Sequence, residues 1–221
     1  METQTADLTV AVQDYLKAIY ALEAAGERVT TSALAARMGV SAPSATAMTK
    51  RLAELGLAER APYRGVVLTE AGRRGALEVL RHHRLLELYL VNRLGLSLDE
   101  VHAEAELLEH ALSEELEAKI DEELGFPTRD PHGDPIPDRE LRVEHAGDST
   151  LLDIVPGARA AVTRVPDGDR DLLRYLAELG LVPGSDVEVV SQAPFGGPVT
   201  VRTESGDHAI SRELADRIAA G

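Results

Sequence analysis

Along the first 75 residues, three segments with helical spacing of apolar residues are followed by two short strand-like segments. Apolar or small residues recur at helical spacing over residues 12–25, and Gly26 follows, so we expect a helix there. Thr30 or Thr31 can cap a second short helix, and Ser41 can cap a third. The segments LAER and VVLT then flank the turn sequence APYRG, which is typical of a β-hairpin. This order predicts a winged helix-turn-helix over residues 1–75.

The next apolar pattern is helical over residues 70–94 and again over residues 99–124. In the second segment an apolar residue recurs every four positions, which predicts one stripe along a single helix, formed by Leu108, Leu112, Leu116, Ile120 and Leu124. Such a stripe can belong to the core or to a contact between subunits. Residues 126–140 are rich in Pro, Asp and Gly and indicate an ordered loop or a linker. We therefore expect a helical domain over residues 76–146.

Strand-like runs characterise the rest of the chain, namely ARAAVTRV, DVEVVSQ and VTVRT. A helical insert, DLLRYLAELG, separates the first two runs, and a final helix can begin at Ser211. A small five-stranded SH3-like β-barrel fits residues 147–221. The expected fold is mainly α with small β parts: a winged helix-turn-helix, a central helical domain and an SH3-like barrel.

The distribution of charge changes the meaning of the net charge of −15. Residues 1–75 carry nine Lys and Arg against eight Asp and Glu, whereas residues 76–140 carry six against seventeen. A nearly neutral first domain can approach DNA, and the acidic middle can bind cations. The absence of cysteine excludes disulfides and thiolate zinc sites. With no signal peptide and no apolar run of about 20 residues, we expect a cytoplasmic protein without a membrane partner.

Ligand-type residues cluster in the second helical segment at positions i, i+4, i+7 and i+8, which share one stripe of a continuous helix: His102, Glu106, Glu109 and His110. His83 and Glu87 form a second pair at a spacing of four. A divalent cation would neutralise such groups if they were buried, and a solvated acidic face is the alternative. The motifs HExxH and GxSxG and a Gly-rich phosphate loop are missing, so we expect no enzyme.

The chain resembles the diphtheria-toxin-repressor family of iron- and manganese-dependent regulators, most closely its manganese-transport-regulator branch. The resemblance covers nearly the whole chain and is carried by VQDYLKAIYALE, LRHHRLLELYLVNRLG, DEVHAEAELLEHALSEEL, GFPTRDPHGDPIP and LLRYLAELGLVPGSDVEVV. The histidine helix together with HGDPIP is specific, whereas a helix-turn-helix alone is not. The resemblance implies that the central domain binds metal and forms the dimer.

The resemblance also implies two metal sites. The primary site maps onto Asp14, Glu106, Glu109 and His110, and the ancillary site maps onto His83, Glu87 and His102. The SH3-like module would supply the remaining ancillary ligands. Arg164 stands where a Glu is expected, and the nearest acids are Asp167 and Asp169, of which Asp167 is the candidate. Iron-type members have Met and Cys in place of Asp14 and Glu106. Because carboxylates are hard ligands, we expect Mn2+ as the cofactor, with Fe2+ second.

The same resemblance implies a DNA interface on the third helix. The positions that face bases are Ser41, Pro43, Ser44 and Ala47, whose short side chains indicate modest direct readout. Candidates for phosphate contacts are Lys50, Arg51, Arg60 and Arg64. An ordinary solvated surface is the alternative for each of these basic residues.

The expected function is a metal-dependent transcriptional repressor. It would bind double-stranded operator DNA as a homodimer when loaded with Mn(II) or Fe(II), and would control metal-homeostasis genes such as those for uptake transporters. A constitutive winged-helix DNA-binding protein and a metal-dependent hydrolase are the alternatives. Metal-dependent binding to DNA distinguishes the three.

Overall fold

A computed structural model describes residues 8–61, 63, 65–143 and 149–221. The chain divides into two compact units. The first unit comprises Met1–His83, Leu108–Glu114 and Pro137–Arg142, and the second comprises Arg84–Leu107, Glu115–Ile136 and Val143–Gly221. Among the described helices, none combines the length and the apolarity needed to cross a membrane.

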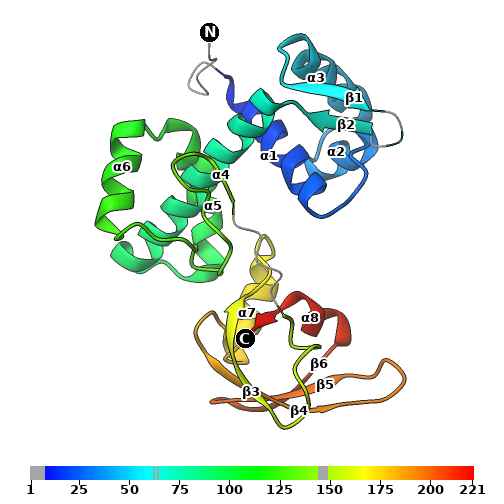
Figure 1. Cartoon of the computed structure of the whole chain (residues 1–221), viewed down its shortest axis with the longest axis vertical. Coiled ribbons are helices and arrows are strands. Elements are labelled where there is room, and N and C mark those ends of the chain that lie inside the picture. The colour runs from blue at the N-terminus through cyan, green and yellow to red at the C-terminus, as the bar shows by residue number, and fades with distance from the viewer. Residues whose placement is uncertain (1–7, 62, 64, 144–148) are drawn as a thin grey trace. The chain divides into compact units, whose positions relative to one another are not determined.

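The first unit contains the predicted winged helix-turn-helix (Figure 1). Its elements are α1 (Val10–Ala24), α2 (Thr31–Arg37), α3 (Ala42–Glu54), β1 (Ala58–Ala61) and β2 (Gly65–Leu68). The predicted caps form: Thr30 Oγ1 accepts a hydrogen bond from Ala33 N, and Ser41 Oγ accepts one from Ser44 N. Each such cap stabilises its helix by about 1 kcal/mol. Leucine and isoleucine side chains without solvent exposure form the core between these elements, among them Leu16, Ile19, Leu34 and Leu52.

The wing joins the body of this domain at Gly65. Val66 N donates to Val29 O at 3.0 Å, beside the connection between α1 and α2. Gly65 has φ +89°, and a Cβ there would lie 2.2 Å from Val29 O. Only glycine therefore allows this approach of two backbones.

Helix α4 (Glu70–Tyr89) begins at a cap formed by Thr69, whose Oγ1 accepts a hydrogen bond from Gly72 N at 3.1 Å. It continues into a π-helical turn, Leu90–Leu94, and ends at Gly95 with φ +73°. The predicted helical segment 70–94 is confirmed. Residues of α4 belong to both units, because the division falls between His83 and Arg84.

The prediction of one helix over residues 99–124 is wrong. Helix α5 (Leu98–Leu108) ends in a 3-10 turn, Glu109–Ala111, and α6 (Glu114–Glu123) begins after an extended residue. Ser113 followed by two glutamates favours a new helix start, since serine caps helices and acids favour their first turn. The apolar stripe is therefore interrupted: Leu108 and Leu116 are 43% and 49% exposed, whereas Ile120 is buried.

The C-terminal part of the second unit is a five-stranded antiparallel sheet of order β6-β5-β4-β3-β7. Its strands are β3 (Arg159–Arg164), β4 (Asp186–Gln192), β5 (Val199–Thr203), β6 (Gly206–Ile210) and β7 (Ala219–Ala220). Helix α7 (Arg170–Glu178) is the predicted insert, and α8 (Arg212–Arg217) is the predicted last helix. Val162, Leu176, Val189, Val201 and Ile218 are among the buried residues of its core. The SH3-like prediction is confirmed, with β6 and β7 added to the three predicted runs.

Candidate metal centre and nucleic-acid face

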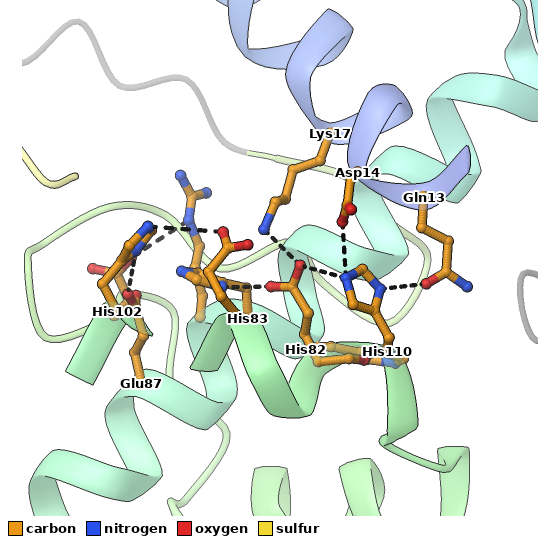
Figure 2. Close-up of polar contacts among 12 residues, drawn as sticks. Gln13, Asp14, Lys17, His82, His83, Glu87, His102 and His110 are labelled. Carbon is orange, nitrogen blue, oxygen red and sulfur yellow. Dashed lines mark hydrogen bonds and ion pairs between the residues drawn. The ribbon is translucent and has the colours of Figure 1, made fainter. Parts of the chain in front are cut away.

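A polar cluster in the first unit is built around Glu109, whose side chain has no solvent exposure. Lys17 Nζ lies 2.6 Å from Glu109 Oε1, and His83 Nδ1 donates to Glu109 Oε2 at 2.5 Å. Helix α1 points Gln13, Asp14 and Lys17 toward this cluster, as Figure 2 shows. A buried carboxylate is costly unless it is paired. Both oxygens of Glu109 have such a partner.

His110 is held so that one ring nitrogen faces carboxylates. Its Nδ1 donates to Gln13 Oε1 at 2.5 Å, because a carbonyl oxygen can only accept. Its Nε2 lies 2.8 Å from Asp14 Oδ1 and 3.4 Å from Glu109 Oε1. With the proton of a neutral ring on Nδ1, the Nε2 lone pair points at oxygen atoms, which is favourable only when a proton or another cation lies between them. A metal-binding histidine has this same arrangement, with its other N–H donated to an oxygen.

Asp14, Glu109 and His110 can together hold a divalent cation. Each offers one ligand atom, and these atoms lie within 4.8 Å of one another. Two carboxylates and one imidazole form a mainly hard donor set, which suits Mn(II) and does not require a soft metal. The residues present therefore fit the metal that the sequence predicts.

Glu106 is separated from Glu109 by the end of α5. It belongs to the second unit, where its Oε1 lies 3.7 Å from His102 Nε2. The prediction that the four ligand-type residues share one stripe of one helix is wrong, because the 3-10 turn changes the direction of Glu109 and His110. His82 is a structural neighbour, with its Nδ1 3.1 Å from the carbonyl oxygen of Glu109.

A second cluster, in the second unit, surrounds Glu87, whose side chain is also without exposure. His102 Nδ1 lies 3.1 Å from Glu87 Oε1, so the structure brings together these two predicted ancillary residues. His132, which is fully buried, places its Nε2 3.7 Å from the same oxygen. His83 lies one helical turn before Glu87 on α4, and its Nδ1 contacts Glu109 Oε2.

Acidic groups of the loop before Ile136 face this second cluster. Burial, together with the charge of Asp134, raises the pKa of Asp130 to about 7 although Arg84 Nε lies 3.4 Å away. Burial also raises the pKa of Asp134. Burial lowers the pKa of His132, but the hydrogen bond and charge of Glu87 outweigh it, so the net shift is upward. The pKa values of three groups of this loop, Asp130, His132 and Asp134, are therefore raised.

Three residues from the end of β3 to the start of α7, Arg164, Asp167 and Asp169, lie at or near the predicted ancillary position of the barrel. The charge of Asp167 contributes to the raised pKa values of His132 and Asp134, which places Asp167 near the second cluster. Asp169 caps α7 by accepting hydrogen bonds from Asp171 N and Leu172 N. Arg164 Nη1 lies 3.8 Å from Asp134 Oδ1.

Helix α3 presents one exposed face that holds most of the predicted DNA-contact residues. This face comprises Ser41, Pro43, Ser44, Ala47, Lys50 and Arg51, and Arg60 is exposed on β1. Arg64 lies outside the described residues. Ser41 Oγ lies 2.8 Å from Ser44 Oγ and also caps the helix, so its hydroxyl has a structural role.

Sequence reasoning missed Gln13 and Lys17 as members of the first cluster and His132 as a member of the second. Gln13 and Lys17 contact residues that are 97 and 92 positions away. No local spacing can reveal such pairs. His132 lies in the HGDPIP segment, whose content of Pro, Asp and Gly predicts only a loop.

Comparisons with known families cover most of the chain. Residues 7–66 match the iron dependent repressor N-terminal DNA binding domain, and residues 69–138 match the iron dependent repressor metal binding and dimerisation domain. The chain belongs to the iron-dependent repressor family. Residues 149–220 of this family member match the FeoA domain.

Similar proteins include both iron and manganese regulators. The iron-dependent repressor IdeR of Mycobacterium tuberculosis is 35% identical, over 96% of this chain and 97% of its own length. The diphtheria toxin repressor of Corynebacterium diphtheriae is 30% identical over the same shares of the two chains. Among solved structures, a manganese-dependent transcriptional repressor in complex with manganese is 42% identical, with a TM-score of 0.84 over 95% of this chain and 98% of that one. The manganese regulator SloR has a TM-score of 0.77 at 30% identity, over 95% and 97% of the two chains.

Proposed function

We propose that this member of the iron-dependent repressor family is a Mn(II)-activated transcriptional repressor, with Fe(II) as the second metal. It binds operator DNA as a homodimer in the cytoplasm and controls metal-homeostasis genes such as those for uptake transporters. It has no catalytic activity. The observation that carries the proposal is the set of Asp14, Glu109 and His110, whose ligand atoms converge within 4.8 Å.

The metal is held by these three residues, together with Glu106, which the family resemblance assigns to the same site. A bound divalent ion supplies positive charge to carboxylates that are otherwise neutralised by side chains. Gln13 keeps the proton of His110 on Nδ1 and so leaves Nε2 available as a ligand. Asp14 and Glu106 provide hard oxygen ligands, which is the basis for preferring Mn(II).

Asp14 links the metal centre to the DNA-reading helix. It lies on α1, which packs against α2, α3 and β2. A metal bound to Asp14 would hold α1 in place, and through these contacts it would also restrict the position of α3. Since binding free energies are coupled reciprocally, operator DNA should raise metal affinity by the same factor by which metal raises DNA affinity. In a two-fold dimer the two α3 helices read half-sites about 34–36 Å apart, or a multiple of that spacing.

The exposed face of α3 performs two tasks. Pro43, Ser44 and Ala47 approach base edges, and Ser41 joins them while it caps the helix. Lys50, Arg51 and Arg60 contact phosphates, and we assign Arg64 of the wing to the same task from the sequence.

The second cluster is proposed as the ancillary site. Its proposed ligands are Glu87 and His102, with Asp167 as the ligand from the barrel. His83 is assigned to the same site from the family resemblance. Glu87 and His102 are already in contact at 3.1 Å.

Operator binding titrated anaerobically with Mn(II), Fe(II), Co(II) and Zn(II) tests the proposal. We expect binding that requires metal, activation by Mn(II) at the lowest concentration, and loss of this response in His110→Ala. His208→Ala is the matched control, since His208 lies in the barrel and contacts Ser205 Oγ. Metal-independent operator binding would indicate a constitutive DNA-binding protein, and metal-dependent hydrolysis without operator binding would indicate an enzyme.

A further inference from the structure

Lys17 brings an ammonium group into the cluster that we propose binds a divalent ion. We propose that Lys17 is an internal counter-cation: it pairs with Glu109 when no metal is bound, and it competes with the metal for that carboxylate. Lys17 is thus a residue that sets the metal threshold of the regulator. The inference rests on the proposed function of the first cluster.

The position of the ammonium group carries the argument. Lys17 lies on α1, three residues after Asp14, and its Nζ is 2.6 Å from Glu109 Oε1. The same oxygen is 3.4 Å from His110 Nε2, the nitrogen that also faces Asp14. The ammonium therefore lies against the carboxylate oxygen that faces the other two ligands. A metal bound there would need the lone pairs that Lys17 now occupies.

Burial makes this competition strong. The Glu109 side chain has no exposure and that of Lys17 is 18% exposed, so water screens their interaction weakly. A divalent ion and an ammonium group at one carboxylate would repel each other. The free energy of metal binding must therefore include the cost of displacing Lys17 from Glu109.

The lysine side chain is suited to this displacement. Its flexible stem allows the ammonium group to move toward solvent while the backbone of α1 stays in place. The pair also prevents Glu109 from being a buried charge without a cation, which would destabilise the protein. The Lys17–Glu109 pair therefore lowers the affinity for metal and stabilises the folded protein when no metal is bound.

Mn(II) affinity of the full-length protein, measured by calorimetry and by the decrease of the free Mn(II) EPR signal, tests the role of Lys17. We expect Lys17→Met to bind Mn(II) at least about 10-fold more tightly, because a charge that opposes the ion is gone. Lys17→Arg keeps the charge and should stay closer to the wild type than Lys17→Met. Lys119→Met removes an exposed lysine from α6 and should change the affinity by less than about two-fold, since salt screens exposed charges.

A second readout does not require metal. In chelator, Lys17→Met should unfold at a temperature a few degrees below the wild type, because the buried Glu109 carboxylate loses its ammonium partner. If this variant does not fold, Lys17→Gln, which is neutral but polar, replaces it in both assays.

The outcomes separate the inference from the function on which it rests. Equal or weaker Mn(II) binding by the neutral variants would overturn the competition by Lys17. If the neutral variants show no gain but His110→Ala loses Mn(II) binding in the same assay, the proposed metal site is supported and only the role of Lys17 is refuted. If His110→Ala binds Mn(II) as the wild type does, the first cluster is not the metal site.

Discussion

Two buried glutamates of this protein, Glu109 in the first unit and Glu87 in the second, have different electrostatic surroundings. Both side chains have no solvent exposure, and both lie against histidines. Glu109 is paired with the ammonium group of Lys17 at 2.6 Å. Glu87 faces His102 and His132, and its negative charge adds to the raised pKa of Asp130.

The difference shows that the types of ligand residue do not decide how a candidate metal site behaves. Glutamate and histidine occur in both clusters, and in the first the glutamate also contacts the ammonium group of a lysine. An extra cation in the first cluster must be exchanged for Lys17. In the second, burial and neighbouring carboxylates raise the pKa values of Asp130 and Asp134. The two clusters should therefore respond differently to mutation, metal and pH.

The largest expected difference is between the histidines of the two clusters. His110→Ala should weaken Mn(II)-dependent operator binding at least about 100-fold, whereas His102→Ala should weaken it about 10-fold, because removal of a primary ligand has a larger effect than removal of a supporting group. Gel-shift titration at fixed Mn(II) measures both. An equal effect in the two variants would remove the distinction between primary and ancillary clusters.

Metal preference should change when the two hard ligands proposed for the primary site are replaced. Asp14→Met combined with Glu106→Cys replaces two hard ligands by soft ones and should favour Fe(II), Co(II) or Ni(II) over Mn(II) by about 10-fold relative to the wild type. Competition titrations under anaerobic conditions measure the ranking. An unchanged ranking would mean that coordination number or the surrounding hydrogen bonds determine selectivity.

The second cluster should make stability depend on pH. The pKa of Asp130 is raised to about 7 by burial, so the folded state keeps a proton that the unfolded chain loses near pH 4. This group therefore destabilises the fold progressively as pH rises from about 4 to about 7, by at most about 1.4 kcal/mol per pH unit. The raised pKa values of Asp134 and His132 act in the same direction.

The free energy of unfolding should fall by at least about 1 kcal/mol less in Asp130→Asn than in the wild type between pH 5 and pH 8, because an amide cannot ionise. The amide oxygen can still accept the hydrogen bonds of His132 N and Asp134 N. Chemical denaturation in chelator at several pH values measures the effect, with the exposed Asp216→Asn as control. A variant with the full wild-type slope would show that Asp130 is not the titrating group.

The smallest effect on the metal clusters is expected from α3, where substitutions should change DNA binding without any change in either cluster. Lys50→Ala should lower operator affinity a few-fold and reduce the salt slope by about one unit for each phosphate that a subunit no longer neutralises. Pro43→Ala should instead relax discrimination by about 1–3 kcal/mol at a contacted base pair with little change in slope. Altered Mn(II) affinity in Lys50→Ala without DNA would contradict the separation of the reading face from the metal clusters.

The local elements of this protein follow from its sequence. Thr30 and Ser41 cap the helices that follow them, and Gly95 ends the π-turn after α4 with a left-handed backbone. These features depend on a few neighbouring residues, so their signals are complete within a short window. The winged helix-turn-helix and the barrel are predictable for this reason.

Only the tertiary structure decided how the ligand-type residues are grouped. Helical periodicity predicts one stripe for Glu106, Glu109 and His110, but the 3-10 turn after Leu108 separates them. The partners of Glu109 and His110 on α1, Lys17 and Gln13, lie more than 90 residues earlier in the chain. A repeat of apolar residues determines which face of a helix is buried, whereas the charge that neutralises a buried carboxylate depends on which distant side chain the fold brings beside it.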